Sequence, residues 1–216
     1  MIQYYFRSEE NETLHALSDF QSHVWIYVEN PSDKELVELA SRYGLEEGHL
    51  RDAIDIHEVP RLEIEGEIKY MYTRFAFREN GRIATAPVLI AMAPHFVLTV
   101  SVQRLPHLDK FLTGKMNAYT NEKGRLLIQL FNEIISEYNS FLTDIGRRVR
   151  YVGVDLEKIG NRDIVQFVSY EAILNDFLTA LVPTQAILNQ LLLDKSFAGE
   201  KDLVEDLFLG IGQLIE

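Results

Sequence analysis

The chain has 216 residues, of which 47% are hydrophobic and 25% charged, so it can build the core of an ordinary globular protein. Its formal net charge of −12 argues against nucleic acid as a partner, because phosphates would be repelled, and permits divalent cations or basic partners. The absence of cysteine excludes disulfides, thiolate zinc sites and cysteine nucleophiles.

The first hundred residues are predicted to alternate strands with short helices. Residues 2–6 (IQYYF) and 23–28 (HVWIYV) are rich in β-branched and aromatic side chains, which is typical of strands. Further along, Ser32 and Glu35 match the pattern of a capping box, and Gly44 suits the left-handed position that follows a helix. A helix is therefore predicted between these two ends.

The acidic stretch at residues 49–66 (HLRDAIDIHEVPRLEIEG) first suggests a metal site, because four potential ligands fall within seven residues: Asp52, Asp55, His57 and Glu58. Pro60 forces the residue before it out of the helical region, so a short helix ends here and a strand begins at Arg61. We therefore expect a structural corner rather than a cation site. Asp55 and Arg61 are expected to hold it through local hydrogen bonds or an ion pair.

Apolar runs after Pro60 predict the rest of a sheet. Residues 61–77 alternate about a turn at Glu65–Gly66, which predicts a hairpin. Residues 86–93 and 95–103 are apolar enough to lie in a sheet that is covered on both faces. Six or seven strands are predicted in all, with helices between and beside them.

From about residue 120 the sequence predicts long helices. Residues 121–160 carry an apolar stripe with steps of four and three, which is typical of coiled coils: Leu127, Phe131, Ile134, Tyr138, Phe141, Ile145, Val149 and Val152. Residues 161–194 repeat such a stripe every seven residues, at Phe167, Leu174, Leu181 and Leu188. The two helices are predicted to form an antiparallel hairpin, with a kink at Pro183. A third helix begins near Glu200 without a stop signal, so the polypeptide is expected to continue.

Motifs for catalysis are missing from this sequence. Its six histidines are scattered, and neither HExxH, a G-x-S-x-G elbow nor a Walker loop occurs. We interpret each histidine as a surface residue or a satisfied core residue, and we do not expect an enzyme. No window of about 18 consecutive apolar residues is present, so the chain as given is not expected to span a bilayer.

Acidic residues are concentrated in one part of the chain. Residues 29–67 hold twelve acids and four bases, a net of −8, which is most of the total of −12. Two interpretations stay open for this segment. It is a solvated acidic face, or it is a surface that attracts divalent cations, for which carboxylates are the preferred hard ligands.

Several pieces of the sequence, in this order, resemble the cytosolic part of the CorA family of divalent-cation (magnesium) transporters. The stretch from Trp25 to Pro31 is similar to the family pattern Trp-hydrophobic-x-hydrophobic-x-x-Pro. The next family segment is matched by Leu50, Ala53, Ile54, Asp55, Pro60 and Arg61. Residues 88–103 resemble the family's last strand pair, and Pro183 with the following leucines resembles the end of the helix before the stalk. The resemblance covers nearly all of the chain.

The resemblance implies the fold class α/β, with three parts. Residues 1–118 would form an α/β/α sandwich with a mixed sheet of about seven strands, residues 119–195 a long antiparallel helical hairpin, and residues 196–216 the start of a stalk helix. In the family the stalk leads to two transmembrane helices and a Gly-Met-Asn motif, which this sequence lacks. The chain is thus expected to be the cytoplasmic regulatory domain that gates a homopentameric pore in the cell membrane. By itself it is expected to be a monomer or a dimer.

The resemblance also implies Mg²⁺ as a regulatory ligand, with zinc, cobalt and other divalent cations left open and no cofactor needed for folding. In the family, an acid just after the long hairpin strand pairs with an acid on the neighbouring subunit's stalk. Arg78 and Gln213 fall at those places, and an arginine is no metal ligand. Glu79 and Asp206, which lie close by in the sequence, are therefore the candidate ligands.

A second hypothesis belongs to a different class: a stand-alone cytosolic protein whose helical hairpin recruits partners. The two hypotheses make different predictions for the gene beyond Glu216. Two further apolar segments are expected for a transporter, and a natural terminus near Glu216 is expected for an interaction protein.

Overall fold

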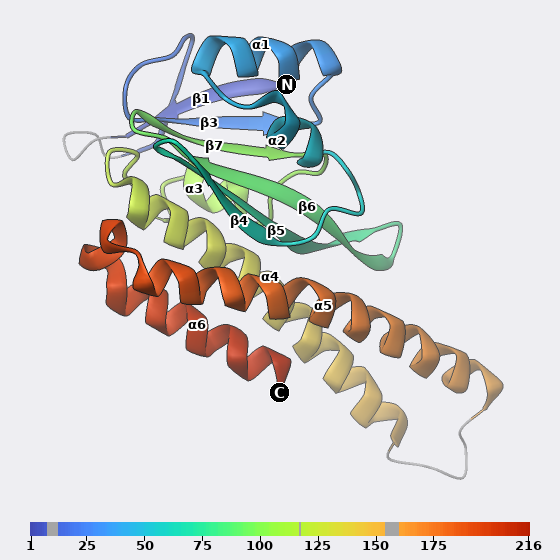
Figure 1. Ribbon diagram of the computed structural model, residues 1–216. Helices are drawn as coiled ribbons and strands as arrows, with labels where there is room; N and C mark the ends of the chain where they lie inside the picture. The colour runs from blue at the N-terminus through green and yellow to red at the C-terminus, as the bar shows by residue number, and fades with distance from the viewer. Residues whose placement is uncertain (8–12, 117, 154–159) are drawn as a thin grey trace.

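The computed structural model describes residues 1–7, 13–116, 118–153 and 160–216, which form three layers (Figure 1). Helices α1 and α2 cover one face of a central sheet, the long helices α4 and α5 cover the other, and α6 packs against α4 and α5. The predicted α/β/α sandwich is confirmed, and so is the antiparallel arrangement of the long helices α4 and α5.

The sheet has seven strands in the order β2-β1-β3-β7-β6-β5-β4. Strands β3 and β7 are parallel, with Trp25 opposite Val97, and every other neighbouring pair is antiparallel, so the sheet is mixed as predicted. The strands are β1 (Ile2–Phe6), β2 (His15–Leu17), β3 (Val24–Glu29), β4 (Arg61–Glu65), β5 (Ile68–Glu79), β6 (Arg82–Met92) and β7 (Phe96–Ser101).

The helices are α1 (Asp33–Tyr43), α2 (Glu47–Asp52), α3 (Leu108–Leu112), α4 (Lys123–Gly153), α5 (Asn161–Leu193), the 3₁₀ helix η2 (Lys195–Glu200) and α6 (Lys201–Ile215). Five helices (α1, α2, α4, α5 and α6) follow the predicted order with changed ends, whereas α3 and η2 were not predicted. The predicted helix 121–160 corresponds to α4, and its residues 154–159 lie outside the described part of the chain. Helix α5 continues through Pro183 to its end at Leu193.

The first helix has the two ends that its sequence predicts. The Ser32 hydroxyl accepts from the Glu35 amide at 3.3 Å, and the Glu35 carboxylate accepts from the Ser32 amide at 2.8 Å. Gly44 follows the helix with φ of +65°, a conformation that costs little for a residue without Cβ. Local sequence alone therefore determines where α1 begins and ends.

Strands β5 and β6 form a long hairpin whose turn the sequence analysis missed. Asn80 and Gly81 make the two-residue turn with φ of +49° and +79°, the combination that type I′ turns need. The Asn-Gly pair was a usable signal for this turn. At the β4–β5 turn, Glu65 pairs with Ile68, so the turn residues are Gly66 and Glu67. The predicted turn was one residue too early.

A hydrophobic cluster lies on each face of the sheet, and side chains alternate between the two along β3. Trp25 joins the cluster under the long helices, and Ile26 joins the cluster under α1 and α2. The cluster with Trp25 also contains Phe131 of α4, Phe177 of α5 and Ile211 of α6. The sheet and the inner faces of the long helices thus share one core.

The predicted coiled-coil stripes are only partly buried. On α4 the stripe is buried from Leu127 to Ile145, whereas Val149 is 39% exposed, and Val152 lies outside the residues whose side chains are described. On α5, Leu181 and Leu188 are buried but Leu174 is 38% exposed. The reason is that both helices pack against the sheet as well as against each other, so the buried face follows the sheet.

Candidate metal and interface site

The segment after α2 is a corner in which Arg61 is the central residue. Its Nη2 lies 2.7 Å from Oδ2 of Asp52, and the same guanidinium pairs with Glu58 and Glu63. Its Cζ lies 3.9 Å from the centroid of the Tyr72 ring, in a cation–π contact. The Arg61 guanidinium holds the pKa of the Glu63 carboxyl below its usual range. One cation therefore joins three carboxylates in and beside the apparent metal cluster.

Asp55 and Arg61 hold the corner as expected, Asp55 through a local hydrogen bond and Arg61 through ion pairs. Oδ1 of Asp55 accepts from the amide of His57 at 2.9 Å, a local turn in which an aspartate bonds its own backbone two residues on. Among the described residues, the acidic partners of Arg61 are Asp52, Glu58 and Glu63. Asp55 therefore shapes the corner through its backbone, and the ion pairs are made by its neighbours.

Arg74 on β5 stabilises the same corner, and the sequence analysis did not single it out. Its Nη1 donates to the carbonyls of Ile56 (2.9 Å) and Glu58 (2.8 Å), while its Nη2 donates to the carbonyl of Thr85 at 3.0 Å. Burial lowers the pKa of the Arg74 guanidinium from its usual value. The role of Arg74 depends on the register of the strands. A single arginine in an alternating run of residues gives no signal of that register.

His49 occupies the inner side of the corner as a buried core residue, as expected for the histidines. Nδ1 lies 2.7 Å from the hydroxyl of Tyr72, and the ring stacks on Tyr70 with centroids 4.0 Å apart. Nε2 faces Oε1 of Glu65 at 3.2 Å. In the described part of the chain, no three His, Asp or Glu side chains are arranged so that they could hold a metal ion. A structural role therefore accounts for this acidic stretch.

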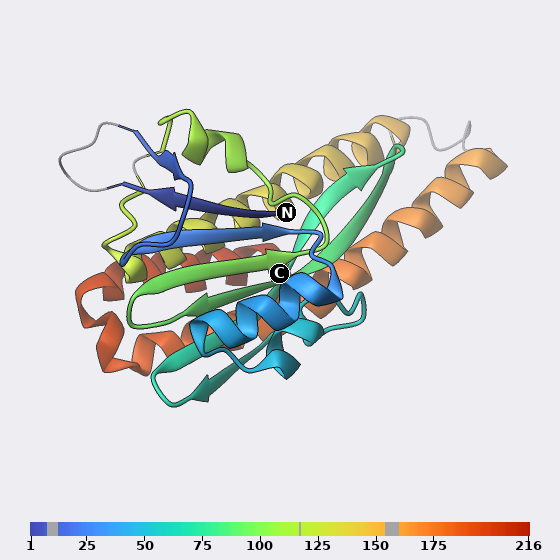
Figure 2. The ribbon, with the colours of Figure 1, turned by 90° about the horizontal axis from the view of Figure 1, so that it is seen from above.

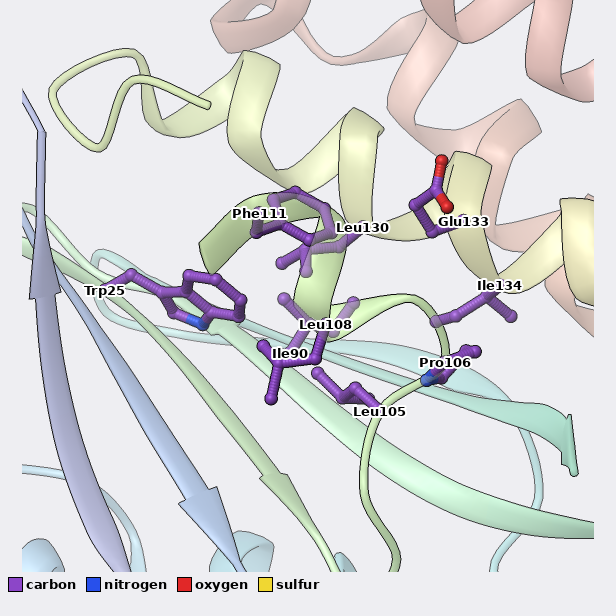
Figure 3. Close-up of a pocket in the computed structure, with 9 residues that line it drawn as sticks. All are labelled: Trp25, Ile90, Leu105, Pro106, Leu108, Phe111, Leu130, Glu133 and Ile134. Carbon is purple, nitrogen blue, oxygen red and sulfur yellow. The ribbon is translucent and has the colours of Figure 1, made fainter. Parts of the chain in front are cut away.

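Trp25, the first residue of the family pattern, is fully buried. Its Nε1 donates to Oγ1 of Thr99 on the neighbouring parallel strand at 3.0 Å. Together with Phe111 and Leu130 it lines a small apolar pocket under α3 and α4 (Figure 3). The cavity of about 10 Å³ has room for roughly one water molecule, so the pocket belongs to the core. Trp25 is a packing residue.

One buried carboxylate borders this pocket. Glu133 on α4 is 4% exposed, and its Oε2 lies 2.7 Å from both Nζ of Lys110 and Nδ1 of His107. Nε2 of the same histidine lies 3.1 Å from Oε2 of Glu137, one helical turn further along α4. These contacts attach α3 to α4, and Lys110 balances the buried charge of Glu133.

The three prolines of the family pattern occupy structural positions. Pro31 directly precedes the N-cap Ser32, and Pro60 is buried immediately before β4. Pro183 lies within α5, next to Thr184, whose hydroxyl donates to the carbonyl of Ala180 at 2.7 Å. These residues shape the elements in which they lie.

Glu79 lies at the exposed end of β5, where the register places it opposite Arg82. Beside it, Nη2 of Arg78 lies 3.2 Å from Oδ2 of Asp144 on α4. The tip of the β5–β6 hairpin is thus attached to the second half of α4. Seen from above, it reaches out toward the far ends of α4 and α5 (Figure 2).

Asp206 is exposed on α6 and lines a groove between α6 and the first half of α4. Arg125, Gln129, Asn132 and Leu203 line the same groove. A helix rises 1.5 Å per residue, so this groove and Asp144 are roughly 14 Å apart or more along α4. A single chain therefore does not bring Asp206 and Glu79 together.

The chain forms a layered α/β domain closed by long helices, and comparison with known proteins gives its family. The family model described as CorA-like Mg²⁺ transporter protein matches residues 20–216. The chain belongs to this family. A curated relative, the cobalt/magnesium transport protein CorA of Methanocaldococcus jannaschii, is 29% identical over 129 residues, which is 56% of this chain and 40% of the relative.

Solved structures share the fold over essentially the whole chain. The soluble domain of CorA from Methanocaldococcus jannaschii has a TM-score of 0.87 at 20% identity, covering 100% of this chain and 89% of the other. The complete CorA structure from that organism has a TM-score of 0.88 at 19% identity, covering 100% and 71%. The cytoplasmic domain of ZntB from Vibrio parahaemolyticus has a TM-score of 0.78 at 10% identity, covering 99% and 88%.

Among the described residues, no helix combines the length and the apolar character that crossing a membrane requires.

Proposed function

We propose that this chain is the cytoplasmic regulatory domain of a CorA-like transporter of Mg²⁺ or a related divalent cation, and that it gates the pore of a homopentamer. The observation that carries the proposal is the family match, which extends over residues 20–216. In this proposal the domain stands on the cytoplasmic side of the cell membrane and performs no catalysis. The cation that passes through the membrane is cargo, and a second ion on the domain is the signal.

Exposed apolar side chains on the long helices support the self-association that the proposal needs. Leu174, Leu178 and Val182 follow one another at intervals of four on α5, so they share one face, and they are 38%, 39% and 50% exposed. On α6, Leu203 and Leu209 are 44% and 54% exposed. Such surfaces favour contact with another copy of the chain in a larger assembly.

Glu79 and Asp206 remain our candidate ligands for a regulatory ion, with the two carboxylates coming from different copies. Carboxylate oxygens are the ligands that Mg²⁺ and Ca²⁺ prefer. Two carboxylates 4 Å apart repel by about 4 kcal/mol at an effective dielectric of 20, and a divalent ion between them reverses the sign. Ion binding would hold the interface together, and loss of the ion would loosen it and favour an open pore.

The test of transport uses the complete gene product in proteoliposomes that contain a fluorescent Mg²⁺ indicator. Addition of external Mg²⁺ is expected to raise the indicator signal, and empty liposomes give the background. Absence of uptake for Mg²⁺, Co²⁺ and Zn²⁺ alike would contradict the proposed cargo. If no cation is taken up and the gene also ends at Glu216, the result would favour the interaction protein instead.

The test of the interfacial ion uses sedimentation velocity of the 216-residue chain with and without millimolar Mg²⁺. Association is expected to increase with Mg²⁺ for the wild type and to lose this dependence in Glu79→Gln/Asp206→Asn. Asp202→Asn, an exposed acid one turn earlier on α6, is the matched control. If the double variant keeps the same Mg²⁺ dependence as this control, these two residues are not the ligands.

A further inference from the structure

A cleft opens where the tip of the β5–β6 hairpin meets the second half of α4 and the first half of α5. Its volume is about 400 Å³, which is within the range of small-molecule sites. The side chains of Arg78 and Arg82 line it from the hairpin and that of Arg148 from α4. We call this hollow the arginine cleft.

The charge of the arginine cleft is opposite to that of the chain. Three guanidinium groups line it against two carboxylates, Asp144 and Asp176, whereas the whole chain has a net charge of −12. Asp176 also acts electrostatically on the half-buried Arg74, and this cation offsets part of the charge of Asp176. The cleft is therefore a local cationic site on an acidic protein.

Two of the arginines are held in place by one acid. Oδ2 of Asp144 accepts from Nη2 of Arg78 and from Nε of Arg148, each at 3.2 Å. A guanidinium has five N–H donors, so most donors of both groups stay available. The side chains of Arg78 and Arg148 are 42% and 50% exposed, which leaves these donors accessible. Asp144 thus orients two guanidinium groups while most of their N–H donors stay available to a ligand.

Arg82 contributes a third cation with all its donors available. In the part of the chain that the structure describes, its side chain has neither a hydrogen bond nor an ion pair, and it lines the same cleft as Arg148. Three guanidinium groups around one cleft attract an anion more strongly than any one of them does. The third cation, exposed and opposite Glu79 in the strand register but not paired with it, is the observation that most directly indicates a ligand.

The α5 side of the cleft adds neutral polar groups and an aromatic ring. Nε2 of Gln166 donates to the hydroxyl of Tyr170 at 2.5 Å, and Ser169 lies between them in sequence with an exposed hydroxyl. Tyr170 is half-buried along the cleft wall. Its ring offers a surface for a planar group, and the amide and hydroxyls offer hydrogen bonds to it.

We propose that the arginine cleft binds a nucleoside diphosphate or triphosphate. Arg78, Arg82 and Arg148 bind the phosphate oxygens, because guanidinium groups match phosphates in charge and bidentate geometry. The base lies on the side of Tyr170 and Gln166. Such a ligand connects β5–β6, α4 and α5, so its binding stabilises the outer half of the helical layer. The inference rests on the cleft alone and does not depend on the proposed transport function.

The test is isothermal titration of the 216-residue chain with ATP and with pyrophosphate, each in EDTA and again with Mg²⁺. Saturable one-to-one binding of ATP is expected, with pyrophosphate weaker by about tenfold because it lacks the base. Adenosine and sulfate at equal concentration are the negative probes. Affinity for ATP is expected to fall as salt increases, since the contacts are ionic.

Variants locate the site. Arg82→Gln and Arg148→Gln are each expected to weaken ATP binding by about tenfold, while Arg78 is left intact because it attaches the hairpin to α4. Arg51→Gln is the matched control, because Arg51 also has an acid four residues away, Glu47, and its side chain is 47% exposed. Circular dichroism checks that each variant folds.

The proposal is overturned if ATP does not saturate at millimolar concentration, or if both cleft variants bind as tightly as Arg51→Gln. Pyrophosphate binding as tight as ATP binding would overturn the nucleotide assignment, because the Tyr170 side would then contribute nothing. A second readout is the thermal midpoint of the wild type, which ATP is expected to raise and adenosine is not. If ATP raises the thermal midpoint of the Arg82→Gln/Arg148→Gln double variant by the same amount, that result would also contradict binding of ATP in the arginine cleft.

Discussion

Thr73 on β5 and Thr184 on α5 share a buried hydrogen bond, with their Oγ1 atoms 2.8 Å apart. The hydroxyl of Thr184 also donates to the carbonyl of Ala180 at 2.7 Å, so its proton is used and Thr73 must be the donor between the two threonines. This bond joins the sheet to α5 at the residue directly after Pro183. The helical layer is thus attached to the sheet within its longest helix.

The two threonines are predicted to contribute unequally to stability. Thr184→Val leaves the Thr73 hydroxyl buried without its acceptor and is expected to cost about 1–2 kcal/mol of unfolding free energy. Thr73→Val leaves Thr184 bonded to Ala180 and is expected to cost about 0.5–1 kcal/mol. Urea denaturation measures both, and a larger loss for Thr73→Val would contradict the assigned donor.

Arg61 is predicted to be the most sensitive charged residue of the corner. Arg61→Gln removes the partner of Asp52, Glu58 and Glu63 at once and leaves three acids close together, so a loss of about 2–3 kcal/mol is expected. Arg51→Gln, an exposed arginine on α2, is expected to change stability by about 0.5 kcal/mol or less. Equal losses in chemical denaturation would mean that the three pairs contribute little.

The acid that caps η2 gives a prediction about pH. Asp194 accepts from the Ser196 amide at 2.8 Å and pairs with Lys69 at 3.0 Å. Burial alone would raise the pKa of Asp194, but these two contacts lower it below its usual value. Its ionised form therefore contributes stability that is complete above about pH 4 and is lost as pH falls through the lower folded-state pKa.

Asp194→Asn removes this charge and keeps a side chain that can still cap, so the expected loss at pH 7 is about 0.5–1 kcal/mol. The gap between wild type and variant should close as the pH falls through the lowered folded-state pKa of Asp194. Thermal unfolding from pH 7 to about 2.5 measures it, with Asp202→Asn as the exposed control. A gap that widens in acid would contradict the assigned pKa direction.

The type I′ turn at the tip of β5–β6 is predicted to depend on its glycine. Gly81→Ala places a Cβ on a residue with φ of +79°, and because no atom lies within 4 Å the cost is backbone strain of about 1 kcal/mol. Gly48→Ala in α2 meets equally open space without a positive φ and is expected to stabilise by about 0.5–1 kcal/mol. Thermal midpoints that shift in the same direction would contradict this interpretation.

Some features could be predicted from the sequence because their causes are local. Ser32, Glu35 and Gly44 determine the ends of α1 within one stretch of chain, and alternating or continuous apolar runs indicated most strands of the mixed sheet. The corner at Pro60 was also foreseen as structural. The family pattern around Trp25 corresponds to core packing, which its burial against Thr99 explains.

Other features depend on contacts between distant segments, which periodicity does not encode. The coiled-coil stripe of α5 failed at Leu174, because the sheet rather than α4 determines which side of the helix is buried. The partners of Arg61 and the role of Arg74 follow from the register of β4, β5 and β6. The arginine cleft brings together Arg82 and Arg148, 66 residues apart in sequence, and no local pattern connects them.

Regulated uptake is the most direct test of whether this domain regulates a divalent-cation pore. The complete gene product is reconstituted with its cytoplasmic side facing the lumen, and the initial rate of Mg²⁺ uptake is measured with the lumen empty or preloaded with millimolar Mg²⁺. We predict that preloading lowers the initial uptake rate of the wild type by much more than the smaller Mg²⁺ gradient alone would. The uptake rate of Glu79→Gln/Asp206→Asn is predicted to fall only by the amount that the gradient explains. Equal slowing in the wild type and in this double variant, matched by Asp202→Asn, would contradict regulation through these two carboxylates.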